Sequence, residues 1–190
     1  LRGAMNICFL SLDYPSTISG GGVGTMVRIL GQALARAGHK VTVIALAMPG
    51  LPAYAEDDGL RIYRVPPGSW HWYAYRGLPY FGPMIVLFLR ELEYSWALYR
   101  QLRTLHRQEP FDLIEGAESG AFFAALKLSR VPLILRLHGE DYTQYRDFLT
   151  AKLRLGRIPQ RVALRRARLL ISSSRNHAQE ISRELGAKHP

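Results

Sequence analysis

The chain has 190 residues, 48% of them hydrophobic and 21% charged, which is the composition of a globular protein long enough to bury one sizeable core. Lys and Arg number 25 against 15 Asp and Glu, and the net charge of +10 favours anionic partners: nucleic acid, an anionic membrane surface or phosphate-bearing substrates. The single cysteine, Cys8, lies in an apolar run, which excludes a disulfide within the chain. We therefore expect Cys8 in the core and the protein in a reducing compartment, the cytoplasm.

The ends of the chain and its apolar stretches give no sign of secretion or membrane insertion. Residues 1–4 have the character of a tag or scar, and Met5 is a plausible native start. The longest apolar stretch, residues 78–89, contains two prolines and is shorter than the roughly 20 residues that a membrane-spanning helix needs. We expect no membrane span.

In chain order, apolar runs of strand length alternate with segments of helical periodicity. Because short connections join them, they predict a doubly wound, Rossmann-like α/β domain with a parallel sheet and helices on both faces. We place this domain at residues 5–185, with the start of an interdomain linker at 186–190. The predicted strands are 6–12, 40–47, 60–65, 112–115, 131–137 and 168–172, and the predicted helices are 23–37, 83–105, 119–128, 159–167 and 175–185.

One long irregular segment, residues 66–83, carries six aromatic side chains. Loops of this length are uncommon unless they are functional or pack on another surface. Two interpretations stay open: an aromatic binding rim, or a surface that packs on a partner domain.

Three consecutive glycines, Gly20, Gly21 and Gly22, follow the first predicted strand and precede a helix. Backbone amides there can approach a ligand closely, and the positive end of the helix dipole favours phosphate; the alternative is a flexible turn. The G-x-G-x-x-G dinucleotide fingerprint fails, and so does the P-loop pattern. We therefore expect neither a nicotinamide cofactor nor an NTPase.

Four stretches, in order, resemble family-4 retaining glycosyltransferases of the GT-B type. The opening from Met5 reads MNICFLSLDYP and then SGGGVGTMVRILGQALARAGHKVTVIAL, and PFDLIEGAESGAFFAAL, VPLILRLHGED and RRARLLISSSRNHAQEI follow. The last three are similar to the family's fourth, fifth and sixth strands with the residues behind them. The resemblance covers nearly the whole chain and implies the N-terminal, acceptor-side domain of a two-domain enzyme. The donor-binding C-terminal domain would lie outside this sequence.

The resemblance implies roles for matching positions. Gly21 and Gly22 would face the donor diphosphate and the reacting sugar, His138 would stand beside the reaction centre as the candidate catalytic residue, and Gly139 matches the small residue after it. The position of His138 at the carboxyl end of a buried strand agrees with this role, whereas a lone histidine elsewhere is more often structural.

Three further side chains are candidates for binding the acceptor. Glu118 follows a predicted strand and could accept bonds from acceptor hydroxyls, or it could be an acid at a helix start. Arg136 lies within an apolar strand, so its burial would require a carboxylate or phosphate partner. Asp141 is the third candidate, and Gly139 is assigned to the same acceptor-binding set. The remaining histidines show no metal-ligand spacing, so we expect no metal site and no cofactor.

The segment from Phe148 to Gln179 contains no acidic residue. Three interpretations of this segment stay open: a solvated face, a surface for an anionic membrane, or a nucleic-acid site. The lack of interleaved aromatic residues argues against binding of single-stranded nucleic acid. Its cations are Lys152, Arg154, Arg157, Arg161, Arg165, Arg166, Arg168 and Arg175.

The resemblance thus implies a metal-independent, retaining, hexosyl-type glycosyltransferase that uses a nucleotide sugar and a saccharide or lipid-linked acceptor. We expect it in the cytoplasm, with possible peripheral contact to the inner membrane face, and inactive without its second domain. A GT-B-shaped sugar-nucleotide epimerase and a noncatalytic α/β binding module remain the alternatives.

Overall fold

A computed structural model describes residues 3–15, 21–69, 82–138 and 158–185. Within these residues seven strands form one sheet in the order β3-β4-β2-β1-β5-β6-β7, and every neighbouring pair is parallel except β3 with β4. The strands are β1 (Asn6–Ser11), β2 (Lys40–Leu46), β3 (Tyr54–Asp57), β4 (Leu60–Val65), β5 (Leu113–Ala117), β6 (Leu133–Leu137) and β7 (Leu169–Ser172).

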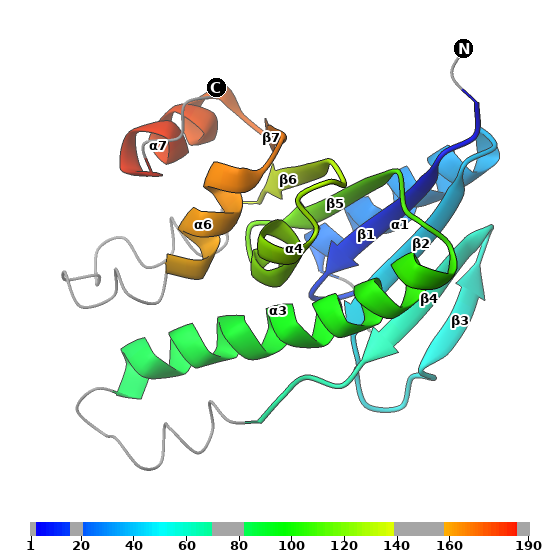
Figure 1. Cartoon of the computed structure of the whole chain (residues 1–190), viewed down its shortest axis with the longest axis horizontal. Helices are drawn as coiled ribbons and strands as arrows, with labels where there is room; N and C mark the ends of the chain where they lie inside the picture. Colours follow the sequence, from blue (N-terminus) through cyan, green and yellow to red (C-terminus); the bar gives the residue numbers. More distant parts are fainter. Residues whose placement is uncertain (1–2, 16–20, 70–81, 139–157, 186–190) are drawn as a thin grey trace.

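Helices cover both faces of the sheet, as Figure 1 shows. Helices α3, α4 and α6 lie over one face, and α1 lies over the other. The helices are α1 (Gly22–Arg36), α3 (Gly82–Gln108), α4 (Phe122–Lys127), α6 (Ile158–Arg166) and α7 (Arg175–Leu185). None of the helices in the described ranges is long and apolar enough to cross a membrane.

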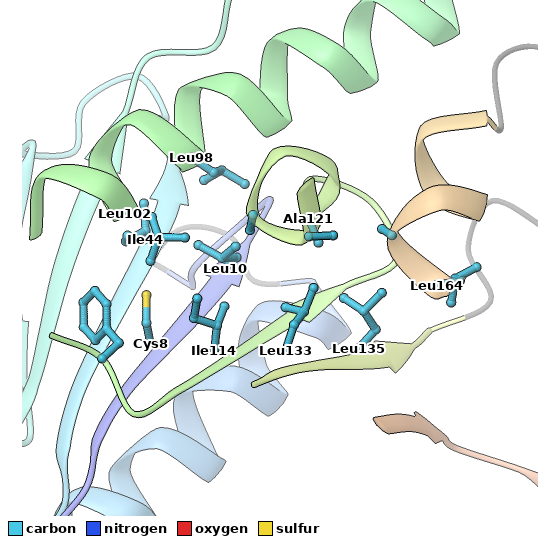
Figure 2. Close-up of a cluster of buried hydrophobic side chains, with 14 of the residues drawn as sticks. Cys8, Leu10, Ile44, Leu98, Leu102, Ile114, Ala121, Leu133, Leu135 and Leu164 are labelled. Atoms are coloured by element: carbon cyan, nitrogen blue, oxygen red, sulfur yellow. The ribbon is translucent and has the colours of Figure 1, made fainter. Parts of the chain in front are cut away.

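The two-sided burial of the central strands explains their continuous apolar sequence. Along β1, Cys8 and Leu10 point into the core under α3 and α4, whereas Ile7 and Phe9 point into the core under α1. Figure 2 shows the first of these cores, with Cys8 among leucines and isoleucines. Each such side chain contributes about 1.5–3 kcal/mol when fully buried. Cys8 is 0% exposed, as expected, and burial raises the pKa of its thiol.

The predicted doubly wound fold is confirmed, and the predicted elements match the observed ones with shifts at their ends. One strand was missed. β3 is a short, half-exposed edge strand that pairs antiparallel with β4 through a tight turn at Asp58 and Gly59, whose φ angles are 47° and 85°. Two central residues with positive φ are typical of a type I′ hairpin turn, for which Asp-Gly is a preferred sequence. The aromatic part of the long 66–83 segment, residues 70–81, lies outside the described residues, so neither interpretation of it is tested.

The strand order reverses beside β1. The chain moves from β1 outward to β2 and β4, then returns to the other side of β1 for β5, β6 and β7. In open parallel sheets of this kind, ligands bind beyond the carboxyl ends of the strands at the reversal point. The ends of β1, β5 and β6 are therefore the first place to look for a site.

Candidate functional site

A cavity of about 220 Å³ opens at the carboxyl edge of the sheet, and we call it the carboxyl-edge cavity. It lies where the strand order reverses, between the ends of β1, β5 and β6 and the N-terminal half of α3. Its polar lining comes from all of these elements: Asp13 after β1, Glu118 and Ser119 after β5, His138 after β6, and Arg90, Glu91 and Tyr94 from α3. Val23, in the first turn of α1, completes the side toward the glycine loop.

Glu118 and His138 are joined directly. The backbone N–H of His138 donates to both carboxylate oxygens of Glu118, at 3.0 and 3.2 Å. Glu118 is only 5% exposed, so its carboxylate needs such polar partners to offset the loss of water. The contact ties the end of β6 to the end of β5 and holds the backbone of His138 at the cavity wall. Glu118 thus holds His138 in place in addition to lining the cavity.

The described part of the glycine loop begins at Gly21, which precedes the first residue of α1. Its N–H donates to the Asp13 carboxylate at 3.2 Å, and no side chain at this position caps the helix. The first amides of a helix have no partner within the helix, and the helix dipole makes this end positive. The N-terminus of α1 therefore presents N–H donors beside the cavity, next to a carboxylate that holds the loop.

The wall formed by α3 is fixed through backbone amides of the segment after β5. Glu91, 7% exposed, accepts a 2.6 Å hydrogen bond from the N–H of Gly120, and Ser95 accepts one from the N–H of Phe123 at 2.9 Å. Gly120 has a φ of +86°, and a Cβ there would meet Leu98 at 2.9 Å, so both the turn and the packing require glycine. These contacts lock α3 and α4 around the cavity.

Arg136 lies apart from the carboxyl-edge cavity. Its Nε donates to Oε1 of Glu115 at 2.7 Å, and the two side chains are 24% and 9% exposed. The carboxylate partner that burial of an arginine in this strand requires is therefore Glu115, from the neighbouring strand β5. The structure places Arg136 in this pair and not among the residues that line the cavity.

Three of the predicted site residues, Gly20, Gly139 and Asp141, lie outside the described residues. Sequence reasoning in turn missed cavity residues on α3, namely Arg90, Glu91 and Tyr94, together with Asp13 and Ser119. Of these residues, only Asp13 could have been identified from the sequence, because it directly follows the first predicted strand. The α3 residues belong to a long helix whose rotation against the sheet decides which of its polar side chains reach the cavity.

The loop after β1 is anchored at a second point by Tyr14, which is 2% exposed. Its hydroxyl donates to Asp57 at 2.8 Å, and Asp57 also pairs with Arg28 of α1 at 2.7 Å. Burial and the bond to Asp57 raise the pKa of Tyr14. Burial alone would raise the pKa of Asp57, but the hydrogen bonds from Tyr14 and Arg28 outweigh it, and the pKa lies below its usual value.

No group of three or more His, Cys, Asp and Glu side chains within the described ranges could hold a metal ion. The predicted absence of a metal remains a prediction.

Comparison with solved structures finds the same fold in several synthases. A sucrose-phosphate synthase from Thermosynechococcus elongatus aligns with a TM-score of 0.66 at 18% identity over 95% of this chain and 45% of its own. The catalytic domain of starch synthase IV from Arabidopsis thaliana gives 0.62 at 15% identity, covering 98% of this chain and 51% of its own. A UDP-forming α,α-trehalose-phosphate synthase from Burkholderia vietnamiensis gives 0.58 at 15% identity, covering 97% and 44%. The chain thus spans about half the length of these structures.

No curated protein sequence matches the chain. A family model described as a glycosyl transferase 4-like domain matches residues 21–190. The match includes the end of the glycine loop, all the helices and every strand after β1. Together with the fold and the position of the cavity, it shows that the chain belongs to the family of glycosyl transferase 4-like domains, with the fold of GT-B glycosyltransferases.

Proposed function

We propose that this chain is the acceptor-side half of a retaining glycosyltransferase that moves a hexosyl group from a nucleotide sugar to an acceptor without a metal ion. The observation that carries the proposal is the convergence of the α1 N-terminus, Glu118 and His138 on one cavity at the reversal point of the sheet. Two related folds support the substrate class: the starch synthase structure is described with ADP and acarbose bound, and a rice protein, Os79, with UDP.

In this proposal the N-terminus of α1, His138 and Glu118 have separate roles. The first amides of α1 and its positive dipole end face the donor diphosphate, where they stabilise negative charge as the nucleotide leaves. His138 stands beside the sugar and accepts hydrogen bonds from it or from the acceptor. Glu118 acts on the backbone of His138, so it is a positioning residue that can also meet acceptor hydroxyls.

Residues 5–185 form the acceptor-side domain in this proposal, and residues 186–190 begin the linker to a donor-binding domain. Because the cleft of such an enzyme lies between two domains, each half supplies only part of the contacts that orient donor against acceptor. The protein would work in the cytoplasm, with peripheral contact to an anionic membrane face through its basic stretch, of which Arg165, Arg166 and Arg168 are exposed. Nucleic acid is not among the proposed partners.

The test uses the full-length enzyme that contains this domain, a panel of UDP-, ADP- and GDP-sugars, and chromatographic analysis of products with assignment of the anomeric configuration. We expect transfer with retention, and no loss of activity on chelation of divalent metals. Conversion of the donor into an isomeric nucleotide sugar, with no acceptor product, would instead identify an epimerase. Release of no product from any donor would favour the noncatalytic module.

The same assay tests the site. His138→Ala should lower kcat more than it raises KM, since it removes a group beside the reacting atoms. Glu118→Gln keeps an oxygen that can accept the His138 N–H, so it should retain much more activity than Glu118→Ala. Arg103→Ala, an exposed change on α3 outside the cavity, is the control. Unchanged turnover in both His138→Ala and Glu118→Ala would refute the site assignment.

A further inference from the structure

A second cavity lies at the opposite, amino edge of the sheet, and we call it the amino-edge cavity. It has a volume of about 550 Å³ and opens between the segment that joins α4 to β6 and the segment that joins α6 to β7. Three arginines line it: Arg130 from the first segment, Arg166 from the last turn of α6, and Arg168 just before β7. Apart from Ser129, the rest of the wall is apolar and includes Leu133 at the start of β6.

This cavity is separate from the candidate active site. Leu133 lines the amino-edge cavity, and His138, five residues later, lines the carboxyl-edge cavity. A strand rises by roughly 3.3 Å per residue, so the two cavities are about 16 Å apart along β6. The two cavities share no lining residue, so we assign the amino-edge cavity no part in the proposed sugar transfer.

The electrostatics of the amino-edge cavity favour an anion. Its described lining includes the three guanidinium groups and neither Asp nor Glu. All three arginines are exposed, and none of them forms an ion pair with a carboxylate in the described part of the chain. Three positive charges at the rim of one concave surface repel each other, and this repulsion is relieved when an anion binds between them.

A simpler explanation is that these arginines only complement helix dipoles. The C-termini of α4 and α6 both lie near the cavity, and each carries roughly half a negative charge. Two such ends offset about one of the three positive charges, which leaves a net charge of about +2. The dipole effect also fades beyond the last turn, and only Arg166 belongs to a helix. Helix capping therefore does not account for Arg130 and Arg168.

We propose that the amino-edge cavity binds the phosphate group of a phosphate-bearing ligand through Arg130, Arg166 and Arg168. Arginine suits this role because its planar fork of N–H donors matches two phosphate oxygens at once. The hydroxyl of Ser129, which also lines the cavity, adds a neutral donor. The ligand is either a small soluble phosphate compound or the headgroup of an anionic phospholipid, and both present the same group to the arginines.

The experiment compares the 190-residue chain with two variants of equal net charge. The first replaces the three cavity arginines (Arg130→Ala, Arg166→Ala, Arg168→Ala). The control replaces three exposed arginines of α3 that line neither cavity, Arg100→Ala, Arg103→Ala and Arg107→Ala. Binding of inorganic pyrophosphate is measured by calorimetry, and binding to vesicles of phosphatidic acid in phosphatidylcholine is measured by sedimentation. Circular dichroism checks that each variant folds, and the single variant Arg168→Ala serves if the triple variant does not.

We expect the cavity variant to lose at least tenfold in affinity in one of the two arms while the control stays within twofold of the unchanged chain. Loss of pyrophosphate binding identifies a soluble ligand, and loss confined to vesicles identifies a lipid headgroup. Raising the salt concentration should weaken either interaction. An equal loss in both triple variants would show diffuse surface charge and overturn the proposal, and so would the absence of binding in both arms. None of these measurements depends on glycosyl transfer, so the proposal stands or falls separately from the proposed sugar transfer.

Discussion

Gly21 and Gly22 are neighbours, yet the structure predicts opposite effects of a side chain at the two positions. A Cβ on Gly21 would lie 2.7 Å from Oδ2 of Asp13, closer than real Cβ contacts come, so the carboxylate would have to move and lose its bond to the Gly21 N–H. A Cβ on Gly22 would meet nothing within 4 Å. Gly22 is also the first residue of α1, where alanine is a better helix former than glycine.

These contacts translate into stability changes of opposite sign. Gly21→Ala should cost about 0.5–1.5 kcal/mol, the worth of one hydrogen bond, and Gly22→Ala should add about 0.4–1 kcal/mol by restricting the unfolded chain. In a domain of this size 1 kcal/mol moves Tm by about 2–4 °C. Thermal unfolding of the two variants, followed by circular dichroism, should therefore give shifts of a few degrees in opposite directions. Equal shifts would refute the steric argument.

The enzymatic activity of a Gly22 variant shows whether this position matters for donor binding as well as for folding. In the full-length enzyme, Gly22→Val should keep the fold but fill the open space beside the α1 amides, and we expect a drop of at least tenfold in kcat/KM for the donor. Gly21→Val should abolish turnover, but it also displaces Asp13, so Gly22→Val is the cleaner test. Full turnover by folded Gly22→Val would show that the donor diphosphate does not approach this face of the helix.

Two further predictions concern the anchor of the β1 loop and the chain by itself. Asp57→Asn should cost about 1 kcal/mol at pH 7, because it weakens the bonds from Tyr14 and Arg28. The pKa of Asp57 is depressed in the folded state, so this contribution is present above the unfolded-state pKa of about 3.9 and is lost as the pH falls further, through the lower folded-state pKa. Urea unfolding of both proteins at several pH values should show the difference in stability closing in acid. The isolated 190-residue chain should fold but show no glycosyl transfer and at most weak nucleotide-sugar binding. Calorimetry and a product assay can check both expectations. Micromolar affinity for the donor would mean that the donor binds to this domain.

The parts of the fold that sequence predicted well are those where one physical signal dominates. Strands buried on both faces are mostly apolar, so β1 and β2 are visible in the sequence as apolar runs, and Gly38 after α1 marks where the helix ends. The edge strand β3 reads YAED, ends in two acidic residues and alternates only between exposed and half-buried positions over four residues. Its apolar signal is too weak to stand out, although the Asp-Gly turn beside it was a usable hairpin signal.

The candidate site could be predicted from the sequence only in part. Sequence places Glu118 and His138 each at a strand end, but the contact between them depends on register. Ala117 of β5 pairs with Arg136 of β6, and this one alignment brings the residue after β5 beside the backbone of the residue after β6. A shift of one residue would turn the side chains of β6 to the other face and move the His138 amide away from the carboxylate. Register follows from packing of the leucines of β6 against α4 and α6, which is a tertiary property, so the convergence of the two strand ends was predictable and their bond was not.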